Sequence, residues 1–312
     1  MTAMAQGGST QLTAADWSAL PPEYAIPESA PSLADARAYC RRLATSHYEN
    51  FSVVTWFLPR KLHDHFYAVY AYCRISDDLG DEVGDAQTSI RLLDAWEDEL
   101  NACYVGNPKH PVFVALAETV KACDIPKKPF ADLLTAFRQD QTVNRYDRFE
   151  DLLGYCRNSA NPVGRLVLYV CGYRDPELQF LSDYTCVALQ LANFWQDVTV
   201  DWQKGRVYLP LEDLRRFNVT EQQIADRKFD HNFRELMKFE VARARDYFNM
   251  GLPLANRVDK HLGTDIELFT RGGQEILNAI ERQDFDVLKS RPAISKSRKL
   301  GLVLNAAIRR LF

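Results

Sequence analysis

The stretch YAYCRISDDLGDE, residues 70–82, combines the periodicity of an amphipathic helix with a cluster of carboxylates. Residues four positions apart on an α-helix differ by about 40° around its axis, so Asp77 and Asp81 share one face. Carboxylates that share a face repel each other unless a cation lies between them. Mg²⁺ prefers such oxygen ligands and commonly bridges protein carboxylates to substrate phosphates. This face is therefore a candidate site for a diphosphate held through Mg²⁺.

A second cluster lies in LQLANFWQDVTVDW, residues 189–202. Asn193, Asp197 and Asp201 again repeat at a spacing of four and span about 80° of a helix face. Their neighbours are apolar nearly all round, which is typical of a buried helix, and buried carboxylates need a partner or a metal ion. One acidic run alone is usually a solvated helix face. Two such clusters in one chain favour a functional site.

The composition of the chain indicates a globular protein with a large core and argues against several other classes of protein. The 312 residues fit one large domain or two small ones, and 46% hydrophobic residues with 12% aromatics support a large core. A net charge of −4 argues against nucleic acid as a partner. The seven cysteines form no CxxC pair, which favours reduced core thiols in a cytoplasmic protein over a zinc site. We identify neither a secretory signal nor an apolar run long enough to span a membrane.

The helical pattern extends along most of the chain. Residues 1–30 are expected to be a mobile lead-in that packs in part through Trp17 and Tyr24. Ser32 with Asp35 resembles an N-cap arrangement. Since alternating strand patterns are absent, the sequence predicts an all-α fold. The expected helices cover residues 61–83, 87–104, 111–123, 129–141, 149–172 with a kink at Pro162, 176–202, 220–227, 231–261, 264–283 and 296–311.

The C-terminal segment, residues 291–312, is expected to form a basic amphipathic helix packed on or beside the domain. From Lys289 onward the chain has seven basic residues and no acidic ones, with apolar residues between them. The favoured interpretation is a last core helix with a basic outer face. The alternative is a helix that lies on an anionic membrane, which would make the protein peripheral to the inner face of that membrane.

In their longer contexts, YAYCRISDDLGDE and LQLANFWQDVTVDWQKGRVYLP resemble the squalene/phytoene synthase family, over residues from about 35 to 285. The resemblance implies one isoprenoid-synthase-type helical domain, residues 31–290, around a central cavity. The two acid motifs would face each other across its mouth and bind an isoprenoid diphosphate with three Mg²⁺ ions. The metal ligands that it implies are Asp77, Asp78, Asp81, Asn193, Asp197 and Asp201.

The same resemblance assigns roles to side chains beside the motifs. Tyr70 and Arg74 match a family tyrosine and arginine that bind or orient the diphosphate. Arg206 and Tyr208 match the basic and aromatic flap of the family. Arginine suits this task because its fork binds phosphate oxygens bidentately. For both arginines the alternative is an ion pair with a nearby carboxylate.

Two further segments, SHYENFSVVTWFLPRKLHDHFYAVYAYCR and DLLGYCRNSANPVGRLVLYVCG, resemble the bacterial hydroxysqualene synthases of the hopanoid pathway. This implies a diphosphate-releasing lyase that ionises presqualene diphosphate and captures the rearranged cation with water, giving hydroxysqualene without NADPH. A companion enzyme would supply the presqualene diphosphate. Asn161 and Gln196 depart from the condensing relatives, and we expect them to hold the water.

Two alternatives stay open. The first is a prenyltransferase that condenses two farnesyl diphosphates head to head, giving presqualene diphosphate, squalene or dehydrosqualene. The second, from a different class, is a catalytically inactive assembly factor of the same fold. In the favoured mechanism aromatic side chains stabilise the cation, with ordinary core packing as the alternative for each of them. The candidates are Phe51, Phe57, Phe66, Tyr70, Phe137, Tyr169 and Phe194.

Overall fold

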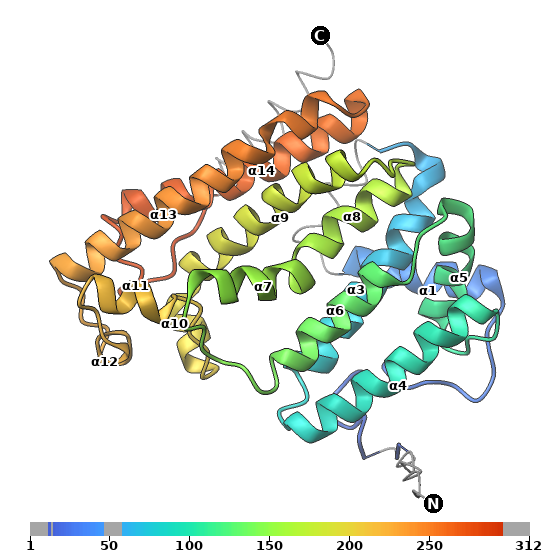
Figure 1. Ribbon diagram of the computed structural model, residues 1–312. Helices are drawn as coiled ribbons and strands as arrows, with labels where there is room; N and C mark the ends of the chain where they lie inside the picture. The colour runs from blue at the N-terminus through green and yellow to red at the C-terminus, as the bar shows by residue number, and fades with distance from the viewer. Residues whose placement is uncertain (1–11, 14, 47–57, 296–312) are drawn as a thin grey trace, which may run out of the picture.

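The computed structural model describes residues 12–13, 15–46 and 58–295. Apart from an isolated parallel bridge between Arg145 and Val207, these residues form helices and loops, so the all-α prediction is confirmed (Figure 1). The long helices are α1 (Leu33–Ser46), α3 (His63–Asp81), α4 (Ala86–Val105), α5 (Pro111–Cys123), α6 (Lys128–Gln139), α7 (Phe149–Ser159), α8 (Asn161–Val170), α9 (Pro176–Gln196), α13 (His231–Gly251) and α14 (Lys260–Arg282). The short ones are η1 (Pro22–Tyr24), η2 (Arg60–Leu62), α10 (Val198–Gln203), α11 (Leu211–Arg216), α12 (Glu221–Ala225) and η3 (Leu252–Asn256).

Three expected helices are shorter than the sequence pattern indicates. The helix predicted over 149–172 is two helices, because Pro162 opens α8 and lacks the N–H that a continuous helix would use. The kink predicted there is a full break at Ala160. The helix predicted over 176–202 breaks at Asp197, between α9 and α10. The helix predicted over 231–261 ends at Gly251.

The segment before α1 is packed onto the helices. Trp17, Leu20 and Tyr24 are buried in the same cluster as the N-terminal helices. The expected packing through Trp17 and Tyr24 is thus observed, while the mobility expected of residues 1–30 stays a prediction. Ser32 accepts a 3.2 Å hydrogen bond from the Asp35 amide, as its cap pattern predicts.

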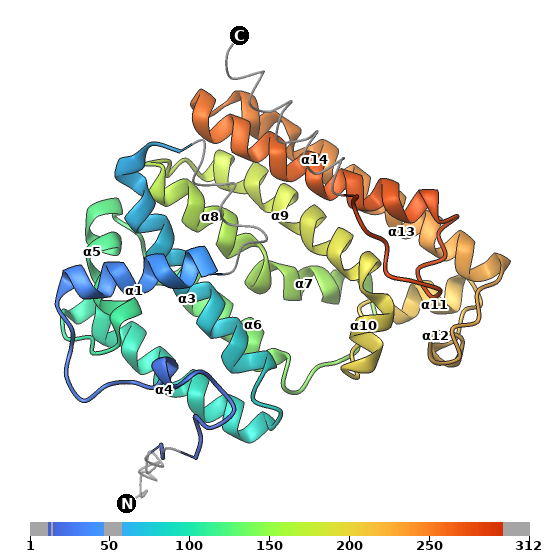
Figure 2. The same ribbon diagram turned by 180° about the vertical axis from the view of Figure 1, so that it is seen from behind.

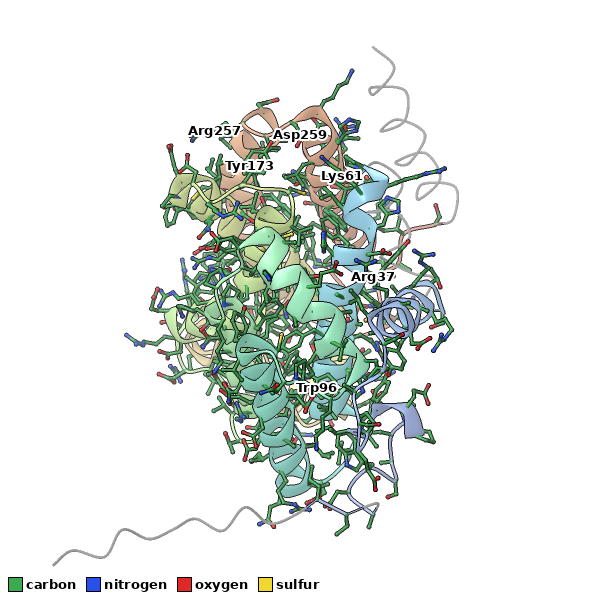
Figure 3. The ribbon with its side chains drawn as sticks, turned by 90° about the vertical axis from the view of Figure 1, so that its right-hand side faces the viewer. Arg37, Lys61, Trp96, Tyr173, Arg257 and Asp259 are labelled. Atoms are coloured by element: carbon green, nitrogen blue, oxygen red, sulfur yellow. The ribbon has the colours of Figure 1, made fainter. Side chains whose placement is uncertain are left out.

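Two large apolar clusters build most of the core. One joins the helices from α1 to α6, and Trp96 lies at its centre (Figure 3), where its indole donates a 3.0 Å hydrogen bond to Ser76. The other cluster contains residues of α7, of α9 and of all the helices from α10 through α14. Figures 1 and 2 show these halves on the two sides of α6 and α8. The cavity described below lies where they meet.

Helix α9 is the axis of the C-terminal half and packs against α8, α13 and α14. Glycines permit close approach here. A Cβ atom on Gly251 would lie 2.3 Å from Thr185 Oγ1, and one on Gly263 would lie 2.5 Å from the Ala255 carbonyl oxygen. The helices could therefore not pack at these distances with any larger residue.

After α14 the chain returns toward the end of α9. Val287 and Leu288 are fully buried, and the segment that follows contacts Gln196 and Asp197. Among the described residues no helix is both long and apolar enough to cross a membrane. The helix expected over 296–311 lies outside the described residues, as do Phe51 and Phe57.

Candidate active site

A cavity of about 760 Å³ lies between the two halves. Its walls come from α3 and α6 on one side and from α7, α9, α10 and the segment after α10 on the other, and these elements can be followed in Figure 2. Predicted site residues that line it are Tyr70, Arg74, Asp77, Asp81, Asn193, Asp201, Arg206 and Tyr208. Residues from both acid motifs therefore meet in one cavity, as the resemblance implied.

The first motif lies at the C-terminal end of α3. Asp77 is accessible from the cavity, yet the enclosing walls and the charges of Asp81 and Asp78 raise its pKa to about 6. Burial also opposes ionisation of Asp81, but hydrogen bonds and charges from Arg206 and Lys204 outweigh it and lower its pKa. The repulsion between carboxylates that the sequence indicates is thus present, and it raises the pKa of Asp77, whereas the pKa of Asp81 is lowered by its cationic partners.

Two cations connect the motifs. Arg206 donates from Nη2 to Asp81 Oδ1 at 2.9 Å, and Lys204 donates from Nζ to Asp81 Oδ2 at 3.0 Å. Arg74 pairs instead with Asp78 on its own helix. The ion pairs named as alternatives for the two arginines are therefore observed, while both side chains also line the cavity. A cation at the cavity wall can pair with a carboxylate or with a bound phosphate.

The second motif is divided by the break after α9. Asn193 and Asp201 line the cavity, but Asp197 does not. The Asp197 carboxylate accepts from Asn193 Nδ2 at 2.9 Å and is paired with Arg291. Burial and the charge of Asp197 raise the pKa of Asp201 to about 7. The three residues thus do not form the single continuous face that their spacing predicted.

The structure places Asp78 outside the cavity wall, and its role as a metal ligand stays a prediction. Its side chain is buried and is absent from the cavity wall. Oδ2 accepts from the Tyr24 hydroxyl at 2.8 Å and from Arg74 Nε at 3.0 Å. Adjacent helical residues lie about 100° apart, so Asp77 and Asp78 point in different directions. In the structure Asp78 stabilises the helix from behind the cavity wall, through its contacts with Tyr24 and Arg74.

Asn161 and Gln196 are also outside the cavity wall, and their expected role in holding water stays a prediction. Asn161 lines a separate pocket on the outer side of α6, α7, α8 and α9. Gln196 donates from Nε2 to the Pro292 carbonyl at 2.5 Å and accepts from Arg291 at 3.2 Å. Gln196 therefore anchors the returning C-terminal segment.

Aromatic side chains form much of the remaining wall. Phe194 and Tyr208 stack with ring centres 3.9 Å apart, and Tyr155 lies 5.9 Å from Tyr208. Of the predicted aromatic candidates, Tyr70, Phe137 and Phe194 line the cavity. Phe66 is buried in the N-terminal core, and Tyr169 packs against that core. For these last two, core packing is what the structure shows.

Asp140 and Tyr155 also line the cavity, although neither is among the site residues predicted from the sequence. Asp140 follows the last residue of α6, and Tyr155 lies on α7. Burial raises the pKa of Asp140 to about 7, against the opposing effects of Arg206 and the Tyr155 hydrogen bond. Neither residue belongs to a repeated pattern, so only their positions in the fold identify them.

The donors in the cavity suit Mg²⁺. Among the described residues no group of three or more carboxylate, histidine or cysteine side chains forms a preassembled metal cluster. Mg²⁺ does not require one, because it retains waters and is usually bound through one or two carboxylates together with substrate phosphates. The raised pKa values of Asp77 and Asp201 mean that burial and neighbouring carboxylates disfavour their ionised forms. A bound cation would stabilise these ionised forms.

Comparison with known proteins identifies the family. The model of the squalene/phytoene synthase family matches residues 44–298. The chain belongs to this family. Its members act on isoprenoid diphosphates, and the cavity with its facing acid motifs lies within the matched region.

Individual relatives span nearly the whole chain. The crystal structure of squalene synthase HpnC from Alicyclobacillus acidocaldarius is 44% identical, with a TM-score of 0.78 over 86% of this chain and 98% of that one. A dehydrosqualene synthase in complex with a ligand is 25% identical, with a TM-score of 0.80 over 89% and 97% of the two chains. The 15-cis-phytoene synthase of Synechococcus elongatus is 33% identical over 86% of this chain and 91% of its own length. These neighbours share the all-α isoprenoid-synthase fold predicted from the sequence.

Proposed function

We propose that the protein ionises presqualene diphosphate in a Mg²⁺-dependent reaction and captures the rearranged cation with water, releasing hydroxysqualene and diphosphate. One observation carries this proposal. The cavity combines carboxylates and arginines from both acid motifs with a wall of stacked aromatic rings. Such a cavity can bind a diphosphate at one place and shelter a carbocation at another.

Asp77, Asp81, Asn193 and Asp201 would hold Mg²⁺ with the diphosphate, and Mg²⁺ when bound supplies Lewis-acid stabilisation of charge on the leaving oxygen. Arg74 and Arg206 would exchange their carboxylate partners for phosphate oxygens. The Arg206 side chain is mostly enclosed, with 16% of its surface exposed, so its interaction with a phosphate would be weakly screened. Asp197 would join the ligands only by giving up its pairing with Arg291.

In the proposed reaction, the aromatic part of the cavity wall would shield the reacting carbons from solvent. Phe194 and Tyr208 present stacked rings to it. A cation over such a desolvated ring gains up to about 2 kcal/mol. A dry wall also prevents early capture of the cation by bulk water. The proposed products need no hydride donor, so the reaction proceeds without NADPH.

The comparison with the squalene synthase HpnC, the structure with 44% identity, supports a reaction in squalene synthesis. Head-to-head condensation is a second candidate. It is favoured by the curated phytoene synthases, such as the cyanobacterial enzyme with 33% identity, and by the dehydrosqualene synthase structure. Both candidates use the same diphosphate end of the cavity and differ in what enters it.

The test is a product assay with Mg²⁺ and without NADPH. One sample receives presqualene diphosphate and the other farnesyl diphosphate, and the extracts are analysed by mass spectrometry. We expect hydroxysqualene from presqualene diphosphate alone, which would require a companion presqualene diphosphate synthase in the cell. Consumption of farnesyl diphosphate would favour condensation instead. Absence of diphosphate release from both would favour the inactive assembly factor.

A further inference from the structure

Asp140 and Tyr155 form a hydrogen-bonded pair in the wall of the cavity. Tyr155 donates from Oη to Asp140 Oδ2 at 2.8 Å, and both side chains line the cavity. The pair belongs to neither acid motif. It comes from the end of α6 and the middle of α7, so it joins the two walls of the cavity.

The two members of the pair differ in exposure. Asp140 Oδ1 is buried and accepts no hydrogen bond from the described residues. Tyr155 is buried and Asp140 is half-buried, and both still line the cavity. A carboxylate in these surroundings is a better proton acceptor than one in water, because burial disfavours its charge. The raised pKa of Asp140 agrees with this.

The pair lies beside the aromatic wall. The Tyr155 ring is 5.9 Å from the Tyr208 ring and 6.3 Å from the Phe194 ring, measured between centres. A cation stabilised by those rings would therefore be close to the Tyr155 hydroxyl. This hydroxyl can accept a hydrogen bond from water while it donates its own proton to Asp140.

We propose that Tyr155 positions the water that captures the cation and that Asp140 receives the proton through it. The inference rests on the proposed function and names the residues for its last step. A lone pair of the water oxygen forms the carbon–oxygen bond. One water proton passes to Tyr155 Oη as the phenolic proton passes to Asp140 Oδ2. The products are a neutral alcohol and a neutral Asp140 carboxyl, without any oxidation or reduction.

The competing role for Asp140 is that of a further metal ligand. Two observations argue against this role for Asp140. Its Oδ2 already accepts a hydrogen bond from Tyr155, and its Oδ1 is buried. The two roles predict different defects. Loss of a metal ligand weakens binding of Mg²⁺ with diphosphate, whereas loss of the relay changes what becomes of the cation after diphosphate has left.

The experiment compares Tyr155→Phe and Asp140→Asn with the wild type on presqualene diphosphate. Released diphosphate and extracted products are quantified in the same samples. We expect the ratio of alcohol to diphosphate to fall at least about tenfold in both variants, since a positioned proton acceptor contributes about 10²-fold or more. C30 hydrocarbons formed by proton loss from the cation should replace the alcohol.

Asp132→Asn is the matched control, because this carboxylate lies on α6, pairs with Lys128 and does not line the cavity. Its ratio of alcohol to diphosphate should equal that of the wild type. Thermal unfolding with and without Mg²⁺ and inorganic diphosphate gives a readout independent of activity, and we expect the wild-type stabilisation in both relay variants. Tyr155→Phe retains the ring, so it tests the relay even if Asp140→Asn does not fold.

Three results would overturn the inference. A wild-type product ratio in Tyr155→Phe and Asp140→Asn would show that the pair does not direct water. Loss of the Mg²⁺ and diphosphate stabilisation in Asp140→Asn would assign Asp140 to the metal site. Failure of the wild type to form any alcohol would overturn the proposed function and the relay together, which distinguishes it from the first two.

Discussion

Tyr24 donates a 2.8 Å hydrogen bond to Asp78, which lies 54 residues later in the chain. This contact ties the segment before α1 to the rear of the first acid motif. Arg74 completes the arrangement by donating to both Asp78 oxygens. Asp77, the next residue, faces the cavity. Two adjacent aspartates thus serve different purposes, and their substitution should have opposite consequences.

Asp78→Asn should destabilise the fold. The substitution removes the charge that compensates Arg74 and weakens the acceptor for Tyr24. Breaking a buried ion pair costs about 3–5 kcal/mol, and the partial exposure of Arg74 reduces our expectation to about 1–3 kcal/mol. Urea unfolding measures this loss. If the free energy of unfolding did not fall, Asp78 would not be a structural residue.

Asp77→Asn should leave stability unchanged or increase it. A carboxyl whose pKa is higher in the folded than in the unfolded state destabilises the fold at any pH where it is ionised, and the pKa of Asp77 is raised to about 6. The same variant should lose the thermal stabilisation that Mg²⁺ with diphosphate gives the wild type. Retained stabilisation would remove Asp77 from the proposed ligands.

Gly263→Ala should destabilise the protein by about 1–3 kcal/mol, because the new Cβ would lie 2.5 Å from a backbone oxygen of η3. Gly272→Ala on the same helix is the control. No atom lies within 4 Å of its added Cβ, and alanine favours the helix by up to about 1 kcal/mol. Denaturant unfolding should therefore shift in opposite directions. Equal shifts would mean that α14 and η3 separate easily.

His110 should make stability depend on pH. Its ring is fully buried, accepts from the Val112 amide and lies against Trp96, and burial lowers its pKa to about 4. Between pH 6.5 and 4 the unfolded chain therefore binds the extra proton. The free energy of unfolding should therefore decrease as the pH is lowered through this window, by up to about 1.4 kcal/mol per pH unit from this group.

His110→Asn supplies the comparison for this prediction. The variant is less stable at every pH because packing is lost, but its unfolding free energy should change less steeply between pH 6.5 and 4. Carboxylates such as the neighbouring Glu99, which accepts from the His110 amide, contribute to both proteins and cancel in the difference. Parallel pH profiles would show that His110 is protonated without cost in the folded state.

The sequence predicts more of the helices than of the site. Periodicity places α3, α4, α5 and α6 to within a few residues, because each helix buries one apolar stripe. It does not reveal the break at Asp197, since apolar residues continue on both sides of that position. The break rotates the following turn, which is why Asp201 reaches the cavity while Asp197 turns to Arg291.

The sequence by itself determined the all-α class and the presence of two acid motifs, because helical periodicity and a spacing of four are properties of neighbouring residues. Only the tertiary structure decided which carboxylates share the cavity. Asp81 meets Arg206 across 125 residues, and Asp140 meets Tyr155 across 15. Such contacts depend on how whole helices pack, and packing is set by the apolar side chains of both core clusters.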